Sequence, residues 1–308
     1  MTLPPLKLLL PWHWPTWLGL GLLRLLLVLP IGLRIAVGRA IGRAVGRLPL
    51  AYARIARSNL QICFPELDEA ARTELLRRHF ASLGIGLAET ALSWWGRRET
   101  VMSMTEVVGL PHLQAALARG RGVIMIGGHF TTIQLAIRIL NELEPVNILY
   151  RPTHNAVLTW MFEHQYARQA RRAIAYDDTR TLLRALKENG VLWYAPDQAF
   201  RKKGAAMIKF FGTPAATNTA TTRLVKLSGA TVLPYFPERL ADARHYRVYI
   251  GPPLEPLPGD SPEDDAALFL RALEAHVRRV PEQYLWIHRR FKGLSPDYPD
   301  YYGRDRRA

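Results

Sequence analysis

His129 is the residue of this 308-residue chain whose surroundings most clearly predict chemistry. Before it, residues 123–126 form a short apolar run that predicts a buried strand. Gly127 and Gly128 then allow a tight turn and a close approach of a ligand to the backbone, and a helical pattern begins at Thr131. His129 therefore lies at the rim of a predicted sheet, where α/β proteins bind ligands. The alternative is a histidine that caps the helix or fills a polar gap.

Polar side chains also follow the next three predicted strands. They are Arg151 after residues 146–150, Asp177 and Asp178 after 173–176, and Asp197 and Gln198 after 191–194. Because the carboxyl ends of parallel strands meet at one edge of a sheet, we expect these side chains to converge on His129. A histidine, an arginine and an aspartate together make an acid–base site with a stabiliser for an oxyanion. Taken alone, Arg151 and Asp197 could form an ordinary salt bridge.

Gln134 lies five residues after His129, and we expect its side chain to reach back to the imidazole. A histidine that acts as a general base is usually oriented by a carboxylate, which accepts the Nδ1 proton, fixes the tautomer and stabilises the imidazolium. The amide of Gln134 brings no charge and can present its NH2 group instead of its oxygen. The equivalent amide substitution in a catalytic triad costs on the order of 10⁴ in rate.

Strands and helices alternate from residue 122 onward, which predicts an α/β domain with a mostly parallel or mixed sheet flanked by helices. The predicted strands are 123–126, 146–150, 173–176, 191–194, 231–236 and 246–250, and the predicted helices are 131–143, 156–170, 179–187, 217–227 and 262–279. Upstream, residues 67–95 predict two helices, the first capped by Asp68 and the pair interrupted at Gly84 and Gly86. Glu89 lies in the apolar second helix, where a carboxylate needs a partner.

The N-terminal stretch predicts attachment to a membrane. Residues 14–30 are apolar apart from Thr16 and Arg24, and their number is near the lower limit of roughly 17–25 residues for a spanning helix. Tryptophans crowd one end and arginines follow the other, a pattern that places the downstream chain in the cytoplasm. Because Arg24 is costly at the bilayer centre, a steeply tilted or half-inserted helix is the alternative. The next helix, 31–48, has a basic face that could lie on anionic headgroups.

The charge of the chain indicates an anionic partner. Lysine and arginine number 41 against 26 acidic residues, a net charge of +15, which suits nucleic acid, anionic lipid or an acidic protein or substrate. Two basic clusters are candidate binding residues: Arg201, Lys202 and Lys203 after the fourth predicted strand, and Arg289 and Arg290 near the C-terminus. We expect no nucleic-acid partner, because no recognised module frames either cluster. We also expect no metal, because the single cysteine, Cys63, has no ligand spacing and is best interpreted as a small core residue.

A series of motifs spread over residues 12–292 resembles, in order, the late acyltransferases of lipid A biosynthesis, most closely the lauroyltransferase type. The motifs are RSNL at 57–60, CFPE at 63–66, ET at 89–90, WW at 94–95, GHF at 128–130, YRP at 150–152, YAPDQ at 194–198, FFGTP at 210–214 and PEQYLWIHRRFK at 281–292. Each motif alone is short, but the ordered set is highly specific.

The resemblance implies an inner-membrane enzyme with its catalytic domain on the cytoplasmic side. Residues 1–48 would be the membrane anchor and basic helix, 49–295 a glycerol-3-phosphate-acyltransferase-like α/β domain, and 296–308 a tail. Such an enzyme moves a fatty acyl group from acyl carrier protein to a hydroxyl on an acyl chain of a Kdo-bearing lipid A precursor. Its partners would be acyl carrier protein, the lipid A precursor and anionic membrane lipids. No cofactor is implied, because acyl-acyl carrier protein is itself the donor substrate.

The resemblance also assigns roles to single residues. The motif of the family is His-x-x-x-x-Asp/Glu, which makes His129 the general base and places the acidic position on Gln134, where this chain departs from the pattern. Either Gln134 slows the enzyme, or another carboxylate assists, with Asp197 as the first candidate. Arg151 is a candidate to hold the oxyanion or an acceptor phosphate. The alternatives are an acyltransferase for another glycolipid or a lysophospholipid, and a catalytically impaired membrane protein that binds acyl carrier protein or lipid A.

Overall fold

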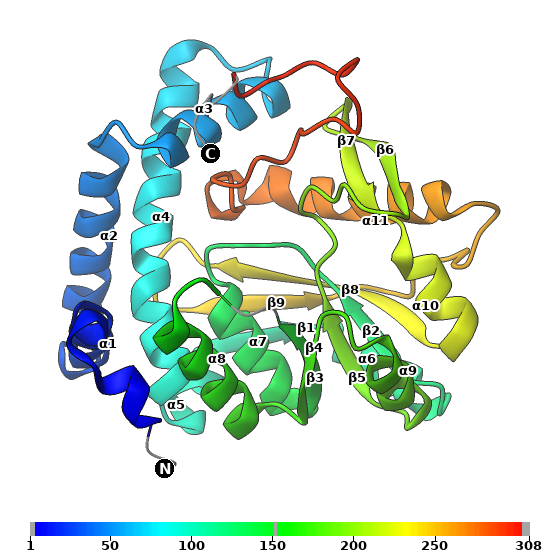
Figure 1. The fold of residues 1–308 in the computed structure, drawn as a ribbon, viewed down its shortest axis with the longest axis horizontal. Coiled ribbons are helices and arrows are strands. Elements are labelled where there is room, and N and C mark those ends of the chain that lie inside the picture. Colours follow the sequence, from blue (N-terminus) through cyan, green and yellow to red (C-terminus); the bar gives the residue numbers. More distant parts are fainter. Residues whose placement is uncertain (1–3, 151–152, 304–308) are drawn as a thin grey trace.

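A mixed seven-stranded sheet forms the centre of the computed structural model, which describes residues 4–150 and 153–303 (Figure 1). Its strands are β1 Thr105–Val108, β2 Val123–Ile126, β3 Val146–Tyr150, β4 Arg172–Ala175, β5 Val191–Tyr194, β8 Thr231–Arg239 and β9 Tyr246–Ile250. The order is β1-β9-β8-β2-β5-β3-β4, and every neighbouring pair is parallel except β8 with β9. A separate antiparallel hairpin joins β6 Ala205–Phe210 to β7 Thr213–Asn218.

Helices cover both faces of the sheet, and further helices pack next to it (Figure 1). They are α1 Trp14–Leu25, α2 Ile31–Arg47, α3 Ala51–Cys63, α4 Glu69–Trp95, α5 Arg98–Ser103, α6 Leu110–Ala118, α7 Ile133–Leu143, α8 Ala156–Gln169, α9 Thr179–Lys187, α10 Ala220–Ser228 and α11 Pro262–Arg279. Because alternate residues of a strand face opposite sides, β2 contributes to two cores. Ile124 and Ile126 join the core under α9, α10 and α11, whereas Val123 and Met125 join the core under α6 and α7. The predicted α/β class is confirmed.

The hairpin β6–β7 and strand β1 were not predicted from the sequence. The hairpin consists largely of small residues, without a strict alternation of apolar and polar side chains. Its turn places Phe211 and Gly212 in the left-handed region of backbone conformation. Since residues 217–218 end β7, α10 begins at Ala220 rather than at 217. The other predicted strands agree with the structure to within a few residues.

Residues 69–95 form one continuous helix, α4, rather than the two that were predicted. Gly84 and Gly86 do not break this helix but allow other segments to approach it. A Cβ atom on Gly84 would lie 2.0 Å from the carbonyl oxygen of Gly38 in α2, and one on Gly86 would lie 2.5 Å from that of Thr131. Asp68 caps the helix as predicted, accepting a hydrogen bond from the Ala71 amide at 2.7 Å.

Glu89 forms the buried ion pair that the sequence indicated. Its two carboxylate oxygens accept hydrogen bonds from Nε and Nη2 of Arg239, at 2.5 and 2.7 Å, and both side chains are buried. Arg239 also donates to Ser82, so the end of β8 is tied to the middle of α4. Cys63 is buried in the core, also as predicted.

We expect Glu89→Ala to destabilise the fold by about 3–5 kcal/mol, because it leaves the buried guanidinium of Arg239 without a countercharge. Chemical denaturation gives the free energy of unfolding. The control is Glu74→Ala, which removes the half-exposed partner of Arg77 and is expected to cost no more than about 1 kcal/mol. Equal losses in the two variants would contradict a structural role for the buried pair.

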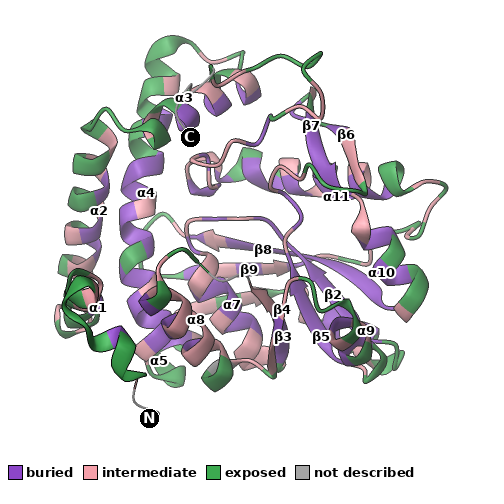
Figure 2. Ribbon diagram, viewed as in Figure 1, coloured by how far each residue is buried: buried purple, intermediate pink, exposed green. Residues whose placement is uncertain are grey.

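The predicted spanning helix is divided in the structure. The helix α1 has 12 residues, a 3-10 turn follows at Leu26–Val28, and the extended backbone at Leu29 and Pro30 ends the run before α2 begins. Within residues 4–150 and 153–303, no helix combines the length and the apolar character that crossing a bilayer requires. The apolar side chains of Leu18, Leu22 and Leu25 in α1 are nevertheless exposed. Figure 2 shows much of α1 in the colour of exposed residues.

Candidate active site

His129 and Asp197 meet at the carboxyl edge of the sheet. The two residues follow β2 and β5, which are adjacent parallel strands, so the turns after them lie side by side. The imidazole Nδ1 lies 2.6 Å from Oδ1 of Asp197, and the backbone N–H of His129 donates to Oδ2 at 2.8 Å. The hydroxyl of Tyr284 also donates to Oδ2, at 3.0 Å. The carboxylate of Asp197 therefore holds both the ring and the backbone of the histidine.

The local sequence lets the chain adopt this geometry. A Cβ atom on Gly128 would lie 2.6 Å from Leu273 and 3.3 Å from Oδ2 of Asp197, so only glycine fits without displacing its neighbours. On the other side of His129, the chain pairs with the segment that follows α11. The Thr131 amide donates to the carbonyl of Gln283 at 2.7 Å, and the Leu285 amide donates to the carbonyl of His129 at 2.9 Å. The backbone of the histidine is thus fixed on both sides.

Electrostatics favour a charged aspartate beside the histidine. Asp197 is buried, and burial alone would raise its pKa, but the charge of His129 and the hydrogen bonds from His129 and Tyr284 hold it at about 2. Burial likewise acts to lower the pKa of His129, but the carboxylate of Asp197 outweighs this effect and the pKa lies above its ordinary value. Burial and the nearby Asp197 raise the pKa of Tyr284 well above 10, so its hydroxyl stays protonated and donates.

The pairing sets the tautomer of the imidazole. An ionised Asp197 accepts the proton on Nδ1, which leaves Nε2 of neutral His129 as a proton acceptor. No residue in the described part of the chain hydrogen-bonds Nε2, and the side chain of His129 is 25% exposed. The structure therefore presents a histidine ready to accept a proton from a bound group.

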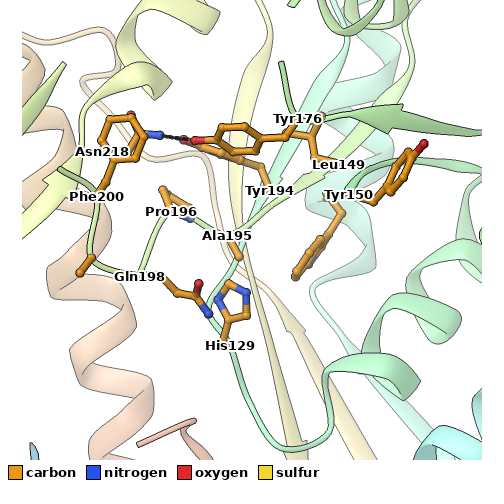
Figure 3. A pocket seen from close by; sticks show the side chains of 12 residues that line it. His129, Leu149, Tyr150, Tyr176, Tyr194, Ala195, Pro196, Gln198, Phe200 and Asn218 are labelled. Carbon is orange, nitrogen blue, oxygen red and sulfur yellow. Dashed lines mark hydrogen bonds between the residues drawn. The ribbon is translucent and has the colours of Figure 1, made fainter. Parts of the chain in front are cut away.

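A pocket of about 310 Å³ opens from His129 (Figure 3). Its walls are largely apolar and aromatic, formed by residues that include Leu149, Trp193, Tyr194 and Pro196. The side chain of Gln198 lies beside the imidazole. At the far end, the Asn218 amide donates to the hydroxyls of Tyr194 and Tyr176, at 3.1 and 3.4 Å. Such a cavity suits the apolar part of a ligand whose reacting group lies next to His129.

The side chain of Gln134 does not reach the imidazole of His129, contrary to the prediction. It lies in the first turn of α7, and its side-chain oxygen accepts a long hydrogen bond of 3.4 Å from the indole N–H of Trp94 in α4. Its side chain also hydrogen-bonds that of Tyr166 in α8. The first turn of α7 faces these two helices, so the carboxylate on the histidine comes from the turn after β5 instead.

The order of the strands in the sheet determines where the other polar residues predicted at strand ends lie. Strand β4 is at the edge, two strands beyond β5, and Asp178 after it caps α9 by accepting a hydrogen bond from the Thr181 amide at 3.0 Å. Asp177 and Asp178 therefore do not join the site. Arg151 lies outside the residues that the structure describes.

The two basic clusters differ in exposure. Arg201, Lys202 and Lys203 are exposed and follow Phe200, which lines the pocket. Arg290, in contrast, is buried, and donates to the carbonyl of Ala216 at 2.9 Å and to the hydroxyl of Thr217 at 2.8 Å.

The structure thus places Arg290 in the core rather than on the surface, and its role in binding substrate stays a prediction. Trp286 and Phe291, before and after Arg290 in the sequence, are buried in the core. Arg290 is buried between them and links residues 286–291 to β7 through its hydrogen bonds. Arg289 instead borders a small hollow against α3, together with Arg54 and Ser58.

Two residues near the site, Tyr284 and His288, were not identified from the sequence. The Nε2 atom of His288 accepts a hydrogen bond from the Ala199 amide at 3.0 Å, next to Gln198. Burial lowers the pKa of His288 to about 4, so it remains a neutral acceptor. The only signal for either residue was its place in the aromatic and basic stretch 281–292.

The site has the parts of a general-base catalyst: a buried carboxylate, an oriented imidazole and an apolar pocket. No group of three or more His, Cys, Asp or Glu side chains in the described residues is arranged to hold a metal ion.

Comparisons with known proteins identify the family of this chain. Residues 5–293 match the family of bacterial lipid A biosynthesis acyltransferases. The chain is 34% identical to a lipid A biosynthesis lauroyltransferase of Escherichia coli strain K12, over 96% of this chain and 97% of that protein. It is 36% identical to the lipid A biosynthesis palmitoleoyltransferase of the same strain, over 92% of each. Among solved structures, a 1-acyl-sn-glycerophosphate acyltransferase of Thermotoga maritima matches 78% of this chain and 98% of its own, with 13% identity and a TM-score of 0.36. The chain belongs to the bacterial lipid A biosynthesis acyltransferase family.

Proposed function

We propose that this chain transfers a fatty acyl group from acyl carrier protein to a hydroxyl on an acyl chain of a Kdo-bearing lipid A precursor. Membership of the family supports secondary acylation in lipid A biosynthesis. The observation that carries the finer proposal is the pair of His129 and Asp197 at the end of a largely apolar pocket. An acyl chain lying in this pocket would present its thioester carbonyl to the histidine.

The proposed reaction uses His129 as base and then as acid. Nε2 accepts the proton of the acceptor hydroxyl while its oxygen attacks the thioester carbonyl, forming a C–O bond. The tetrahedral intermediate collapses by breaking the C–S bond, and the imidazolium returns the proton to the departing thiolate. Asp197 stabilises the imidazolium between the two steps. Arg151 stays a candidate for holding the oxyanion or an acceptor phosphate.

The surface supports the proposed partners. The exposed cluster of Arg201, Lys202 and Lys203 lies next to the pocket residue Phe200, where it could bind the acidic carrier protein. Leu18, Leu22 and Leu25 expose apolar side chains on one helix, α1, and exposed apolar patches of this kind mark interaction with membranes or proteins. We infer attachment to the cytoplasmic side of the inner membrane through this N-terminal region.

The direct test is an assay with acyl-acyl carrier protein and a Kdo-lipid A precursor, with the product identified by mass spectrometry. We expect an acceptor heavier by one acyl group. Transfer only to a lysophospholipid or another glycolipid would support the enzyme and overturn the acceptor. Binding of both substrates without transfer would favour the binding protein over the enzyme.

Gln134→Glu separates the two interpretations of the acidic motif position. Because the carboxylate on His129 comes from Asp197 and Gln134 contacts Trp94, we expect the substitution to change kcat by no more than about tenfold. This is small beside the factor of about 10⁴ attributed to an orienting carboxylate. Single-turnover acyl transfer by the two proteins measures the difference. A gain of a thousandfold would show that Gln134 is a brake on the enzyme and that Asp197 alone does not suffice.

A further inference from the structure

A second pocket lies between α2, α4 and the end of β8, with a volume of about 440 Å³. It shares no lining residue with the pocket at His129. Four arginines line it: Arg39 and Arg43 from α2, Arg78 from α4, and Arg239 from β8. Its two acidic lining residues are Glu238 and Glu282. Nothing in the proposed acyl transfer uses this pocket.

Both acidic residues of the pocket already have partners. Glu282 pairs with Arg78 at 2.8 Å. Glu238 pairs with Arg279 at 3.2 Å and accepts a hydrogen bond from Tyr249 at 2.9 Å. Among the four arginines that line the pocket, Arg239 is paired with Glu89, as described above. These carboxylates therefore leave the other two arginines of the pocket, on α2, uncompensated.

Arg39 and Arg43 form no ion pair with any residue that the structure describes. The Nε atom of Arg43 is moreover buried without a hydrogen-bond acceptor. The charge of Arg43 contributes to lowering the pKa of Glu74 on α4, but the carboxylate of Glu74 is hydrogen-bonded by Arg77. A buried donor on a charged group is costly to leave unsatisfied. Arg39 and Arg43 therefore bring to the pocket two cationic side chains that have no acidic ion-pair partner among the described residues.

The chemistry of the donors selects the anion. Guanidinium groups bind phosphate through paired, charge-assisted hydrogen bonds. The spacing of Arg39 and Arg43 by four residues places them as neighbours on one side of α2. The close contact of Gly38 and Gly42 with α4 keeps α2 in place beside the pocket.

The surroundings of the pocket favour a lipid as the source of the phosphate. Leu33, Ile41 and Val45 of α2 are exposed, as are Leu18 and Leu22 of α1. Exposed apolar side chains on the helix that also carries the arginines are typical of a segment that lies at a membrane surface, where anionic lipid headgroups are available. We propose that Arg39 and Arg43 bind the phosphate ester of an anionic lipid headgroup in the pocket between α2, α4 and β8.

The test compares two single substitutions on the same helix that remove the same charge. Arg43→Gln alters the pocket, and Arg47→Gln alters an exposed arginine one turn further on. The full-length proteins are titrated with inorganic phosphate at constant ionic strength, with thermal unfolding as the readout, because a ligand of the folded state raises Tm. They are also sedimented with vesicles of phosphatidylcholine, with and without phosphatidylglycerol.

We expect Arg43→Gln to weaken phosphate binding, and the added binding due to phosphatidylglycerol, by about tenfold or more, and Arg47→Gln to change either by less than about twofold. Without phosphate, Arg43→Gln should unfold at or above the Tm of the parent chain, because its Nε has no partner in the protein to lose. This result separates loss of binding from loss of fold.

Three results would overturn the proposal. Equal losses in the two variants would mean general attraction of the basic surface. Phosphate binding that depends on Arg43, without any effect on vesicles, would assign the pocket to a free phosphate rather than a lipid. No effect of phosphate on the parent chain would remove the site altogether. None of these readouts depends on acyl transfer, so the proposed function can fail independently.

Discussion

We expect His129→Ala to reduce acyl transfer by at least about 10²–10⁴-fold, the range that general acid–base catalysis usually contributes. The substitution removes the only ring that combines a free Nε2 with a place in the apolar pocket, among the residues that the structure describes. Initial rates with saturating acceptor and acyl-acyl carrier protein measure the loss in kcat. The other lining residues of this pocket are unchanged, so binding of the donor should change far less than kcat.

A second histidine–aspartate pair provides the matched control. His245 and Asp242 approach each other as closely as His129 and Asp197 do, with Nδ1 to Oδ2 at 2.6 Å, but their side chains are about half exposed. Neither residue lines the pocket at His129. We therefore expect His245→Ala to retain the parental rate. Equal losses in both variants, or full activity of His129→Ala, would remove His129 from its proposed role as the base.

The sequence predicted much of the sheet because buried strands and amphipathic helices have different periods. It failed where packing overrides local pattern. Gly84 and Gly86 have low helix propensity, yet the close approach of α2 and of the loop after His129 makes glycine necessary within α4. The strands β6 and β7 have no strong sequence pattern of their own. They are stabilised by pairing with each other and by packing in the core that includes α11.

The site was predictable to the extent that it depends on parallel strands. His129 and Asp197 follow adjacent strands, so their convergence could be inferred before the structure. The direction of Gln134 could not, because a spacing of five residues across a turn does not determine which way the first turn of a helix faces. Tyr284 could not be inferred from spacing either, since it is 87 residues from Asp197 and meets it only through the path of the chain after α11.

The substitution Asp197→Asn is expected to reduce kcat by about 10³–10⁴-fold and to change its pH dependence. The base must be neutral, so activity of the parent chain should fall as the pH drops through the pKa of His129, which lies above its ordinary value of 6.5. Without the negative charge of Asp197, burial is the main remaining influence, and it lowers the pKa of His129. The acidic limb of kcat/KM should therefore move to lower pH in the slower enzyme.

This shift distinguishes an orienting carboxylate from one that only supports the fold. A partly unfolded variant would lose rate at every pH and keep the parental midpoint, whereas loss of the charge moves the midpoint below 6.5. Asp242→Asn, in the exposed pair with His245, should leave both rate and midpoint unchanged. A midpoint that stays in place or rises in Asp197→Asn would mean that Asp197 does not set the charge state of His129. In that case the proposed mechanism would need another group to control the proton. Gln198, which lies beside the imidazole, and the predicted site residue Arg151 would be the next to substitute.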